Sequence, residues 1–285
     1  MSNMISYLFE TKAFKICPEN KPFWYTSGKI GPYFINTHFL YGSEKEASEF
    51  LEFINEEKEQ KLTLPERVFK QSFKQYNENT IYHTVIDQMK SFIEENIPVE
   101  EVDYISGGER RDWFFSNILA HLLNKPHLTI FKDLQVVASD SNFEETTLIE
   151  KLNGAKVLHI ADLITVASSY IRAWIPAIEE IGGTILWSAV VVDRMQGGGE
   201  KLKAKNIDSY SLVHINKDLF DQAFKMGIIN STQQDMLYQF FDNPDESMRN
   251  FLLAHPEFLE QALASDEKTA KRAQTCIDNN LYNLV

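Results

Sequence analysis

The middle of the chain alternates short, nearly continuous apolar runs with segments whose apolar residues recur at helical spacing. The runs are "VDYISGG", "KPHLTIFKD", "KVLHIAD" and "TILWSAVVVDR", and the helical segments between them are "RRDWFFSNILAHLLN" and "SSYIRAWIPAIEEIGG". Continuous apolar strands that alternate with helices are typical of a parallel sheet covered on both faces. The pattern therefore predicts an α/β fold with a doubly wound, mostly parallel sheet, in which ligands bind beyond the carboxyl ends of the strands.

The N-terminal part predicts a hairpin followed by helices. In "FWYTSGKIGPYFI", β-prone aromatic residues stand on either side of a turn that contains Gly and Pro. Ser43 and Glu46 form a capping box at the start of an amphipathic helix. Pro65 begins a second helix, and residues 80–97 supply a third.

Later helix boundaries are marked by prolines and capping residues. Pro176 predicts a kink or a late start of the helix that contains it. Ser231 with Gln234, and Asn243 before Pro244, mark starts among the short helices after residue 217.

These patterns divide the chain into three expected parts. Residues 1–42 form an N-terminal hairpin segment, and residues 43–215 form the α/β core with an added helical insert near residues 62–95. Residues 216–285 form a helical C-terminal extension with no chemical motif, so packing or oligomerisation is its expected role.

Composition and charge narrow the classes of partner. The 285 residues carry a net charge of -13, and 44% of them are apolar, so the chain can bury a large core. Nucleic acid and anionic membranes demand clustered Lys and Arg, so neither is an expected partner. No apolar run is long enough to span a membrane, and Cys17 and Cys276 show no metal-ligand or redox spacing. We therefore expect a cytoplasmic protein that holds any anionic ligand in a local site.

The stretch "KVLHIADLITVASS" carries the strongest candidate chemistry. A strand ends at Asp162, and the following turn offers the hydroxyls of Thr165, Ser168 and Ser169 before a helix begins. Backbone N–H groups at a helix N-terminus, together with such hydroxyls, can hold a phosphate, while a preceding carboxylate binds sugar hydroxyls. Taken alone, the same residues also fit a helix cap with no ligand.

Three segments in order resemble the type I phosphoribosyltransferases, and orotate phosphoribosyltransferase most of all. "FWYTSGKIGPYFINTHFLYG" resembles the N-terminal hood of that family. "VDYISGGERRDWFFSNILAHLLNKP" resembles its strand, pyrophosphate loop and helix. "KVLHIADLITVASS" with "VVVDRMQGG" resembles its phosphoribosyl diphosphate motif and the strand that follows.

The resemblance implies transfer of ribose 5-phosphate from phosphoribosyl diphosphate to a nitrogen of a nucleobase, with release of pyrophosphate. It implies Mg²⁺ held mainly by the phosphoribosyl diphosphate, no direct metal ligand from the protein, and a homodimer. By the resemblance, the 5-phosphate is held by Thr165, Val166, Ala167, Ser168 and Ser169, and the pyrophosphate by Arg110 and Arg111. The base is expected near Ser27, Gly28 and Phe34. The catalytic residues implied are Asp162, Lys132 and Arg111, with Lys132 at the start of a mobile loop.

Several positions depart from the family pattern. Ala161 replaces the first of two acids, and Ala167 replaces a turn glycine, which is tolerable if the turn needs no positive φ there. The loop after Lys132 has Gln135 and Val137 where orotate enzymes carry a further lysine and histidine. The chain is therefore either an orotate-like phosphoribosyltransferase or a protein of that fold that senses a nucleotide or sugar phosphate without catalysis.

Two further groups have plainer alternatives. Arg110 and Arg111 can also pair with Glu109 and Asp112 on the surface, independent of any ligand. His159 lies within a predicted strand, where an interior, hydrogen-bonded histidine is more common than a catalyst.

Overall fold

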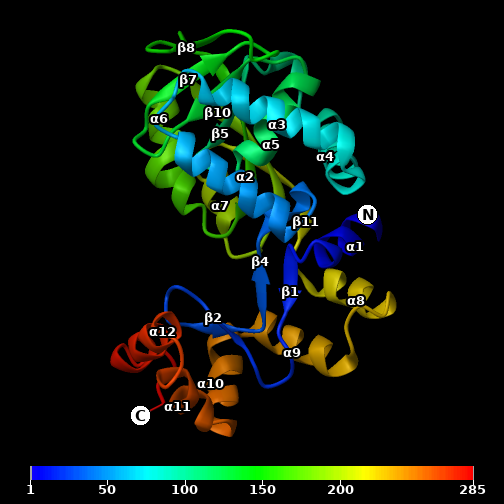
Figure 1. Ribbon diagram of the computed structural model, residues 1–285, viewed down its shortest axis with the longest axis vertical. Helices are drawn as coiled ribbons and strands as arrows, with labels where there is room; N and C mark the ends of the chain where they lie inside the picture. Colours follow the sequence, from blue (N-terminus) through cyan, green and yellow to red (C-terminus); the bar gives the residue numbers. More distant parts are fainter. Residues whose placement is uncertain (1, 285) are drawn as a thin grey trace. The chain divides into compact units, whose positions relative to one another are not determined.

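The structure is a computed structural model that describes residues 2–284, and these form two compact units (Figure 1). Residues 37–215 make the α/β unit, and the described residues 2–36 together with 216–284 make the second unit. The hairpin segment and the helical extension, which the sequence suggests as separate parts, thus belong to one unit.

The α/β unit contains a seven-stranded sheet with the strand order β11-β10-β9-β5-β6-β7-β8. The strands are β5 (Tyr104–Gly108), β6 (His127–Ile130), β7 (Val136–Ser139), β8 (Thr146–Leu148), β9 (Lys156–Ile164), β10 (Thr184–Asp193) and β11 (Asp208–His214). The neighbours from β11 to β6 run parallel, whereas β7 and β8 are added antiparallel. The predicted doubly wound, mostly parallel sheet is confirmed.

The chain leaves the two central strands, β5 and β9, in opposite directions along the sheet. From β5 it passes through α5 (Trp113–Leu122) to β6, and from β9 it passes through a π-helical turn (Tyr170–Trp174) and α6 (Ile175–Glu180) to β10. Since such crossovers are right-handed, α5 and α6 cover opposite faces. The ends of β5 and β9 therefore form a topological switch point, the usual place for a ligand in this architecture.

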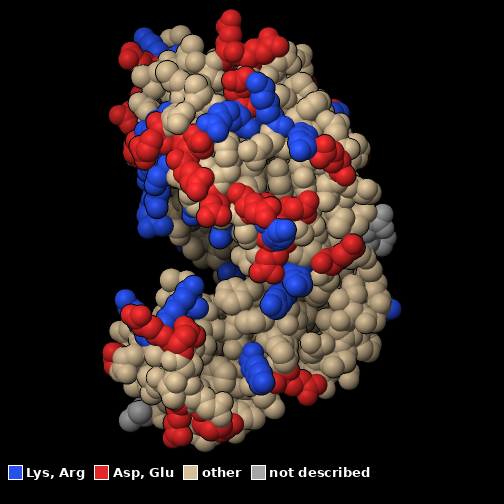
Figure 2. Space-filling view, viewed as in Figure 1, with Lys and Arg blue, Asp and Glu red and all other residues tan. Residues whose placement is uncertain are grey.

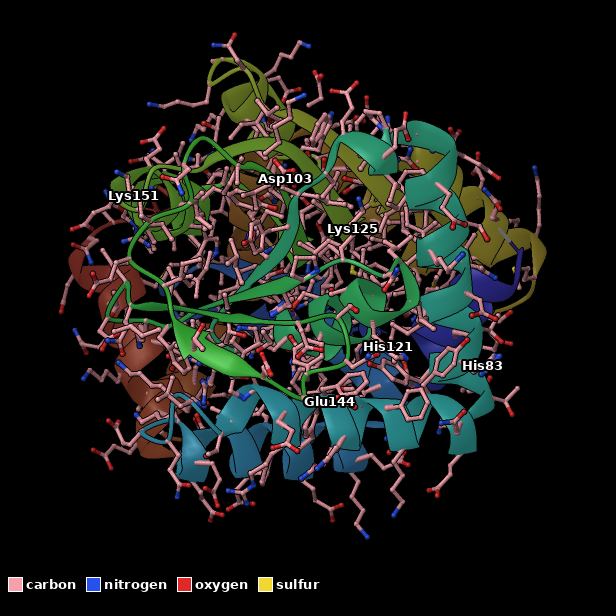
Figure 3. The ribbon with its side chains drawn as sticks, turned by 90° about the horizontal axis from the view of Figure 1, so that it is seen from above. His83, Asp103, His121, Lys125, Glu144 and Lys151 are labelled. Carbon is pink, nitrogen blue, oxygen red and sulfur yellow. The ribbon has the colours of Figure 1, made fainter. Side chains whose placement is uncertain are left out.

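Helices α2 (Glu44–Glu57), α3 (Leu64–Glu78) and α4 (Thr80–Asn96) lie outside α5, and the last two form the expected insert. Phe69 of α3 stacks on Phe143 in the turn between β7 and β8, and Tyr82 of α4 donates a hydrogen bond to the carbonyl of Phe114. His121 also holds this turn through the carbonyl of Ser141, at 3.0 Å, and Figure 3 shows His121 beside the turn that carries Glu144. The insert therefore completes the hydrophobic layer over α5 and anchors the turn at the edge of the sheet.

The remaining elements of the α/β unit are short. They are the 3₁₀ turns Thr37–Tyr41 and Val99–Glu101, and α7 (Gly198–Lys203), which packs against β11.

The second unit joins the N-terminal hairpin to the helical extension. Its elements are α1 (Ser2–Glu10), β1 (Phe14–Ile16), β2 (Phe23–Trp24), β3 (Ile30–Gly31), β4 (Tyr33–Ile35), α8 (Lys217–Lys225), α9 (Ser231–Asp242), α10 (Pro244–Ala254), α11 (Glu257–Leu263) and α12 (Glu267–Asp278). Strands β2 and β3 pair antiparallel, so the predicted hairpin is confirmed. Trp24 stacks on Phe258, and the Tyr282 hydroxyl accepts a 2.8 Å hydrogen bond from the N–H of Ile30. The extension thus buries one side of a hairpin that is too small to be stable alone.

The sequence predicted the cap of α2 correctly, and it placed the capping box of α9 one residue too late. Ser43 caps α2 and bonds to Glu46 as expected. The capping box of α9 uses Asn230 and Gln233, one residue before the predicted pair, because the asparagine carboxamide accepts the Gln233 N–H at 2.8 Å. Pro176 lies at the start of α6, as the late helix start requires.

The surface carries scattered charge. On the face drawn in Figure 2, acidic and basic side chains are interspersed, and Lys and Arg form no large patch. Among residues 2–284, no helix is long and apolar enough to cross a membrane. Cys17 and Cys276 are free and buried, and burial raises the pKa of the Cys17 thiol to about 11, so this thiol is unreactive at neutral pH.

Candidate active site

A pocket of about 410 Å³ opens at the switch point, beyond the ends of β5 and β9. Its walls come from the loop after β5, the end of β9, the following turn and the π-helical turn. The residues that line it are Glu109, Arg110, Arg111, Asp112, Ala161, Asp162, Leu163, Ile164, Thr165, Val166, Ala167, Ser168, Ser169, Tyr170 and Trp174. The carboxyl ends of β5 and β9 therefore meet in one cavity, at the edge of the sheet where the sequence predicts a ligand.

Two glycines let the backbone at the end of β5 pass close to other elements. A Cβ atom on Gly107 would lie 2.1 Å from the Ser116 Oγ, and one on Gly108 would lie 2.2 Å from the Trp174 ring. Trp174 lines the pocket and is buried, so this close approach fixes one wall of the cavity. Only glycine fits at either position without displacing a neighbour.

Replacing Gly108 with alanine is expected to destabilise the protein by about 1 to 3 kcal/mol, because the new methyl group overlaps a buried indole. Chemical unfolding measures this loss, and Trp fluorescence reports movement of the ring. Gly199→Ala is the matched control, since a Cβ there meets no atom within 4 Å. Equal stability of the two variants would contradict the proposed close packing.

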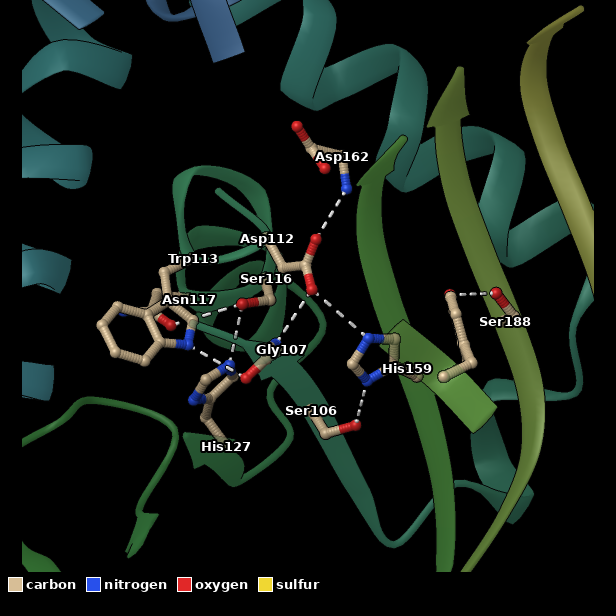
Figure 4. A network of polar contacts seen from close by, with 12 residues as sticks. Ser106, Gly107, Asp112, Trp113, Ser116, Asn117, His127, His159, Asp162 and Ser188 are labelled. Carbon is tan, nitrogen blue, oxygen red and sulfur yellow. Dashed lines mark hydrogen bonds and ion pairs between the residues drawn. The ribbon is translucent and has the colours of Figure 1, made fainter. Parts of the chain in front are cut away.

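Asp112 joins the two sides of the pocket through buried hydrogen bonds (Figure 4). Its Oδ1 accepts the N–H of Asp162, and its Oδ2 accepts the N–H of Gly108, both at 3.0 Å. The His159 Nε2 lies 3.5 Å from the same Oδ2, and the His159 Nδ1 lies 2.9 Å from the Ser106 Oγ. The suggestion that Asp112 forms a surface ion pair is wrong, because its carboxylate is buried and bonded to the backbone of two strands.

Asp162 is buried beside this carboxylate and faces the pocket. Burial, reinforced by the negative charge of Asp112, raises the pKa of Asp162 well above its ordinary value, while nearby Arg111 opposes the rise. Such strongly perturbed carboxyls are concentrated at functional sites.

The turn from Thr165 to Ser169 forms the second wall. Ala167 has a φ of 55°, so the turn does take the left-handed conformation, which alanine tolerates less well than glycine. A non-glycine residue there stores strain of about 1 to 3 kcal/mol, which the buried surroundings of Ala167 must offset. The condition under which the sequence made alanine readily tolerable here, a turn without positive φ, is therefore not met.

Because Ala167 has a positive φ, glycine and valine at this position should affect the stability of the protein differently. Ala167→Gly is expected to keep the free energy of unfolding within about 1 kcal/mol of wild type, because relief of strain offsets the added freedom of the unfolded chain. Ala167→Val is expected to lose about 2 kcal/mol or more, since a β-branched residue fits this region poorly. Urea unfolding of both variants, with Ala173→Val in the neighbouring helical turn as control, measures the difference. A valine tolerated equally at 167 and 173 would argue against the left-handed turn.

Arg110 and Arg111 supply the positive charge of the pocket. Neither forms an ion pair with an acidic side chain among the described residues, so the plainer alternative of pairing with Glu109 and Asp112 is not realised. Burial, together with the charges of Arg111 and Arg110, lowers the pKa of His38 to about 3. His38 is therefore neutral at physiological pH, and the unpaired cations of the pocket are the two arginines.

Comparisons with known proteins agree with this geometry. No protein-family model matches the chain. An orotate phosphoribosyltransferase of Methanosphaera stadtmanae is 27% identical over 133 residues, which are 47% of this chain and 72% of that protein. Leishmania donovani UMP synthase superposes with a TM-score of 0.57 at 16% identity, over 85% of this chain but only 42% of the other. An orotate phosphoribosyltransferase of Francisella tularensis gives 0.54 at 15% identity, over 83% and 96%.

The chain has the type I phosphoribosyltransferase fold. Its resemblance to orotate phosphoribosyltransferases, suggested by residues 23–42, 102–126 and 156–198, is confirmed. The chain spans less than half the length of the Leishmania UMP synthase chain that it matches.

Within this fold, the residues suggested by the resemblance are distributed unevenly. The pocket collects Asp162, Arg110, Arg111 and the turn 165–169. Lys132 is exposed and is absent from the described lining of the pocket, although its N–H donates a 2.8 Å hydrogen bond to Glu109.

The residues suggested for the base belong to the second unit. Phe34 lies against Phe23 and Tyr25, with ring centroids 4.9 and 5.4 Å apart. Ser27 is exposed, whereas Gly28 is buried with its Cα facing Thr275 of α12. Their roles in binding a base stay predictions.

Sequence reasoning missed two contributors to the site. Asp112 appeared only as a possible surface partner of the two arginines, and Trp174 lay unnoticed in a helical segment. Asp112 stands four residues after Gly108, a spacing that lets a side chain cap the end of its own loop, and this was the available signal. His159 is confirmed as an interior histidine, fully buried between Ser106 and Asp112.

Proposed function

We propose that the protein is a phosphoribosyltransferase that moves ribose 5-phosphate from phosphoribosyl diphosphate to a nucleobase, as orotate phosphoribosyltransferases do, and releases pyrophosphate. One observation carries the proposal. A single cavity at the switch point brings together two unpaired arginines, a carboxyl with a perturbed pKa and a turn rich in hydroxyl groups. These groups match the pyrophosphate, the ribose and the 5-phosphate of one ligand.

Each part of the ligand has a counterpart of suitable chemistry. The backbone N–H groups and hydroxyls of Thr165, Ser168 and Ser169 suit a phosphate dianion. Asp162 suits the ribose hydroxyls, since a carboxylate accepts two hydrogen bonds from a diol. Arg110 and Arg111 suit the pyrophosphate, whose negative charge grows as the bond to the anomeric carbon breaks.

The donor set also fits Mg²⁺ held mainly by the ligand. Among residues 2–284, no group of three or more His, Cys, Asp or Glu is arranged as a metal site. Mg²⁺ commonly binds substrate phosphates with one or two carboxylates and waters, and the Asp162 carboxyl lines the pocket. When bound, the ion would neutralise charge on the pyrophosphate.

A sensor of a nucleotide or sugar phosphate is the second candidate, and the connection after β6 favours it. Residues 131–135 form a tight turn closed by the Phe131 N–H and the Gln135 carbonyl at 2.9 Å. The following turn is anchored by buried Phe143. In the described lining of the pocket, Arg110 and Arg111 are the cations, and no lysine adds to them. Fewer cations favour binding over stabilisation of a transition state.

Calorimetric titration with phosphoribosyl diphosphate, with and without Mg²⁺, tests the binding that both candidates share. Saturable binding to wild type and at least tenfold weaker binding to Asp162→Asn are expected. Lys203→Gln, an exposed residue outside the pocket, is the matched control. No heat at millimolar ligand would refute both candidates.

Release of pyrophosphate separates the two candidates. With orotate or another nucleobase present, a transferase releases pyrophosphate in step with a nucleotide, and Asp162→Asn lowers that rate. Binding without any release, across the common bases, would refute the transferase and leave the sensor.

A further inference from the structure

A second hollow lies next to the turn 165–169, on the surface of the α/β unit. It has a volume of about 420 Å³ and is lined by Val166, Ser168, Ile171, Arg172, Lys201, Ala204 and Lys205. We call it the cationic hollow. It shares Val166 and Ser168 with the pocket at the switch point, so one turn forms a wall of both cavities.

The charge of this hollow is unusual for so acidic a protein. Arg172, Lys201 and Lys205 line it, no acidic residue does, and none of the three forms an ion pair among the described residues. By contrast, Lys203 on the same helix pairs with Asp208 at 2.6 Å. Three cations without an acidic partner in the cationic hollow attract an anion, because no neighbouring carboxylate neutralises their charge.

The rest of the lining is apolar. Val166 and Ile171 are each 37% exposed, and Ala204 lies beside them. Exposed aliphatic side chains within a concavity favour an apolar group on the ligand, such as the ring of a nucleobase. The combination favours an organic anion with an apolar part over a simple inorganic ion.

Two of the cations already hold the shared turn. The Lys201 Nζ donates to the Val166 carbonyl at 3.4 Å, and the Arg172 Nε donates to the Ser168 carbonyl at 3.3 Å. Between these carbonyls lies Ala167 with its positive φ. An anion that draws on Lys201 and Arg172 therefore acts on the backbone that forms the other side of the pocket.

We propose that the cationic hollow is a second binding site for a small organic anion with an apolar ring, of the class of nucleoside monophosphates, and that its occupancy stiffens the turn 165–169. The phosphate lies against Arg172, Lys201 and Lys205, and the ring lies against Val166 and Ile171. This site is separate from the proposed transfer reaction and does not depend on it.

Calorimetric titration with uridine 5′-monophosphate tests the site, using Asp162→Asn protein, which lacks the carboxylate assigned to the ribose, to weaken binding in the switch-point pocket. One saturable site is expected. Adding Lys201→Gln and Lys205→Gln should weaken it at least tenfold, whereas adding Lys203→Gln should leave it unchanged. All three lysines are exposed, so the variants should fold.

Hydrogen exchange tests whether the nucleotide acts on the turn 165–169, and inorganic phosphate tests whether the ring contributes to binding. Uridine 5′-monophosphate should slow exchange of the amides of residues 166–169 in Asp162→Asn protein, and this protection should vanish with Lys201→Gln and Lys205→Gln. Inorganic phosphate should bind at least tenfold more weakly, because it lacks the ring. The proposal is overturned by no binding at millimolar nucleotide, by equal loss with Lys203→Gln, or by phosphate binding as tightly. Failure of phosphoribosyl diphosphate to bind wild type would leave this test intact.

Discussion

Asp112→Ala is expected to lower the free energy of unfolding by about 2 to 5 kcal/mol, because it leaves two buried N–H groups, on Gly108 and Asp162, without an acceptor. Loss of a negative charge beside Asp162 opposes this effect, since it removes the repulsion that raises the pKa of that carboxyl. The hydrogen-bond loss is larger, because Asp162 can already avoid the repulsion by holding a proton. Urea unfolding at neutral pH measures the net change.

Asp112→Asn separates the two contributions. Asparagine keeps one acceptor oxygen but presents an NH₂ group to the other N–H, so an intermediate loss of stability is expected. Glu109→Ala is the matched control, since Glu109 in the same loop accepts one N–H, from Lys132, in an exposed setting. If Asp112→Ala and Glu109→Ala cost the same, the buried network does not connect the two strands as described.

The sheet and the position of the pocket were predictable because they depend on patterns that are local in the sequence. Buried parallel strands require continuous apolar residues, as in "KVLHIAD" and "TILWSAVVVDR", and the carboxyl ends of such strands mark the ligand edge. The same reasoning placed Asp162 and the turn after it at the site without any knowledge of the packing around them.

The details that shape the pocket depend on contacts between distant segments. Asp112 and Asp162 are fifty residues apart, and no local pattern shows that the carboxylate of one meets the backbone of the other. The φ of Ala167 is likewise set by the surroundings of the turn, because an isolated alanine favours negative values. Sequence therefore identified the residue types of the site, whereas their hydrogen-bond partners and backbone strain required the fold.

In the helical extension, too, the helices could be predicted from the sequence, whereas their contacts with the hairpin could not. Its helices were predictable from Asn243, Pro244 and the apolar spacing, but their purpose was not. The structure gives that purpose in part, since Arg272 donates a 3.0 Å hydrogen bond to the Trp24 carbonyl and Tyr282 holds Ile30. A hairpin with few residues per strand gains from these contacts the burial that it lacks by itself.

Arg111→Gln is expected to weaken binding of phosphoribosyl diphosphate by about 10- to 100-fold, the value of a lost hydrogen bond to a charged group. Arg111 is exposed at the mouth of the pocket and forms no ion pair with another described side chain, so its removal leaves no buried charge unpaired. Stability should therefore stay within about 0.5 kcal/mol of wild type, as for most surface substitutions. Calorimetric titration and urea unfolding on the same sample give both values.

The comparison with Lys132→Gln decides which cation faces the pyrophosphate. Lys132 is exposed but does not line the pocket, so its loss should change the affinity less than twofold while Arg111→Gln weakens it strongly. The reverse order would mean that the residues after β6 move over the ligand when it binds, and that Lys132 rather than Arg111 contacts the pyrophosphate. Similar small effects in both variants would show that the charge of the pocket does not determine binding, and would contradict the assignment of the pyrophosphate to Arg110 and Arg111.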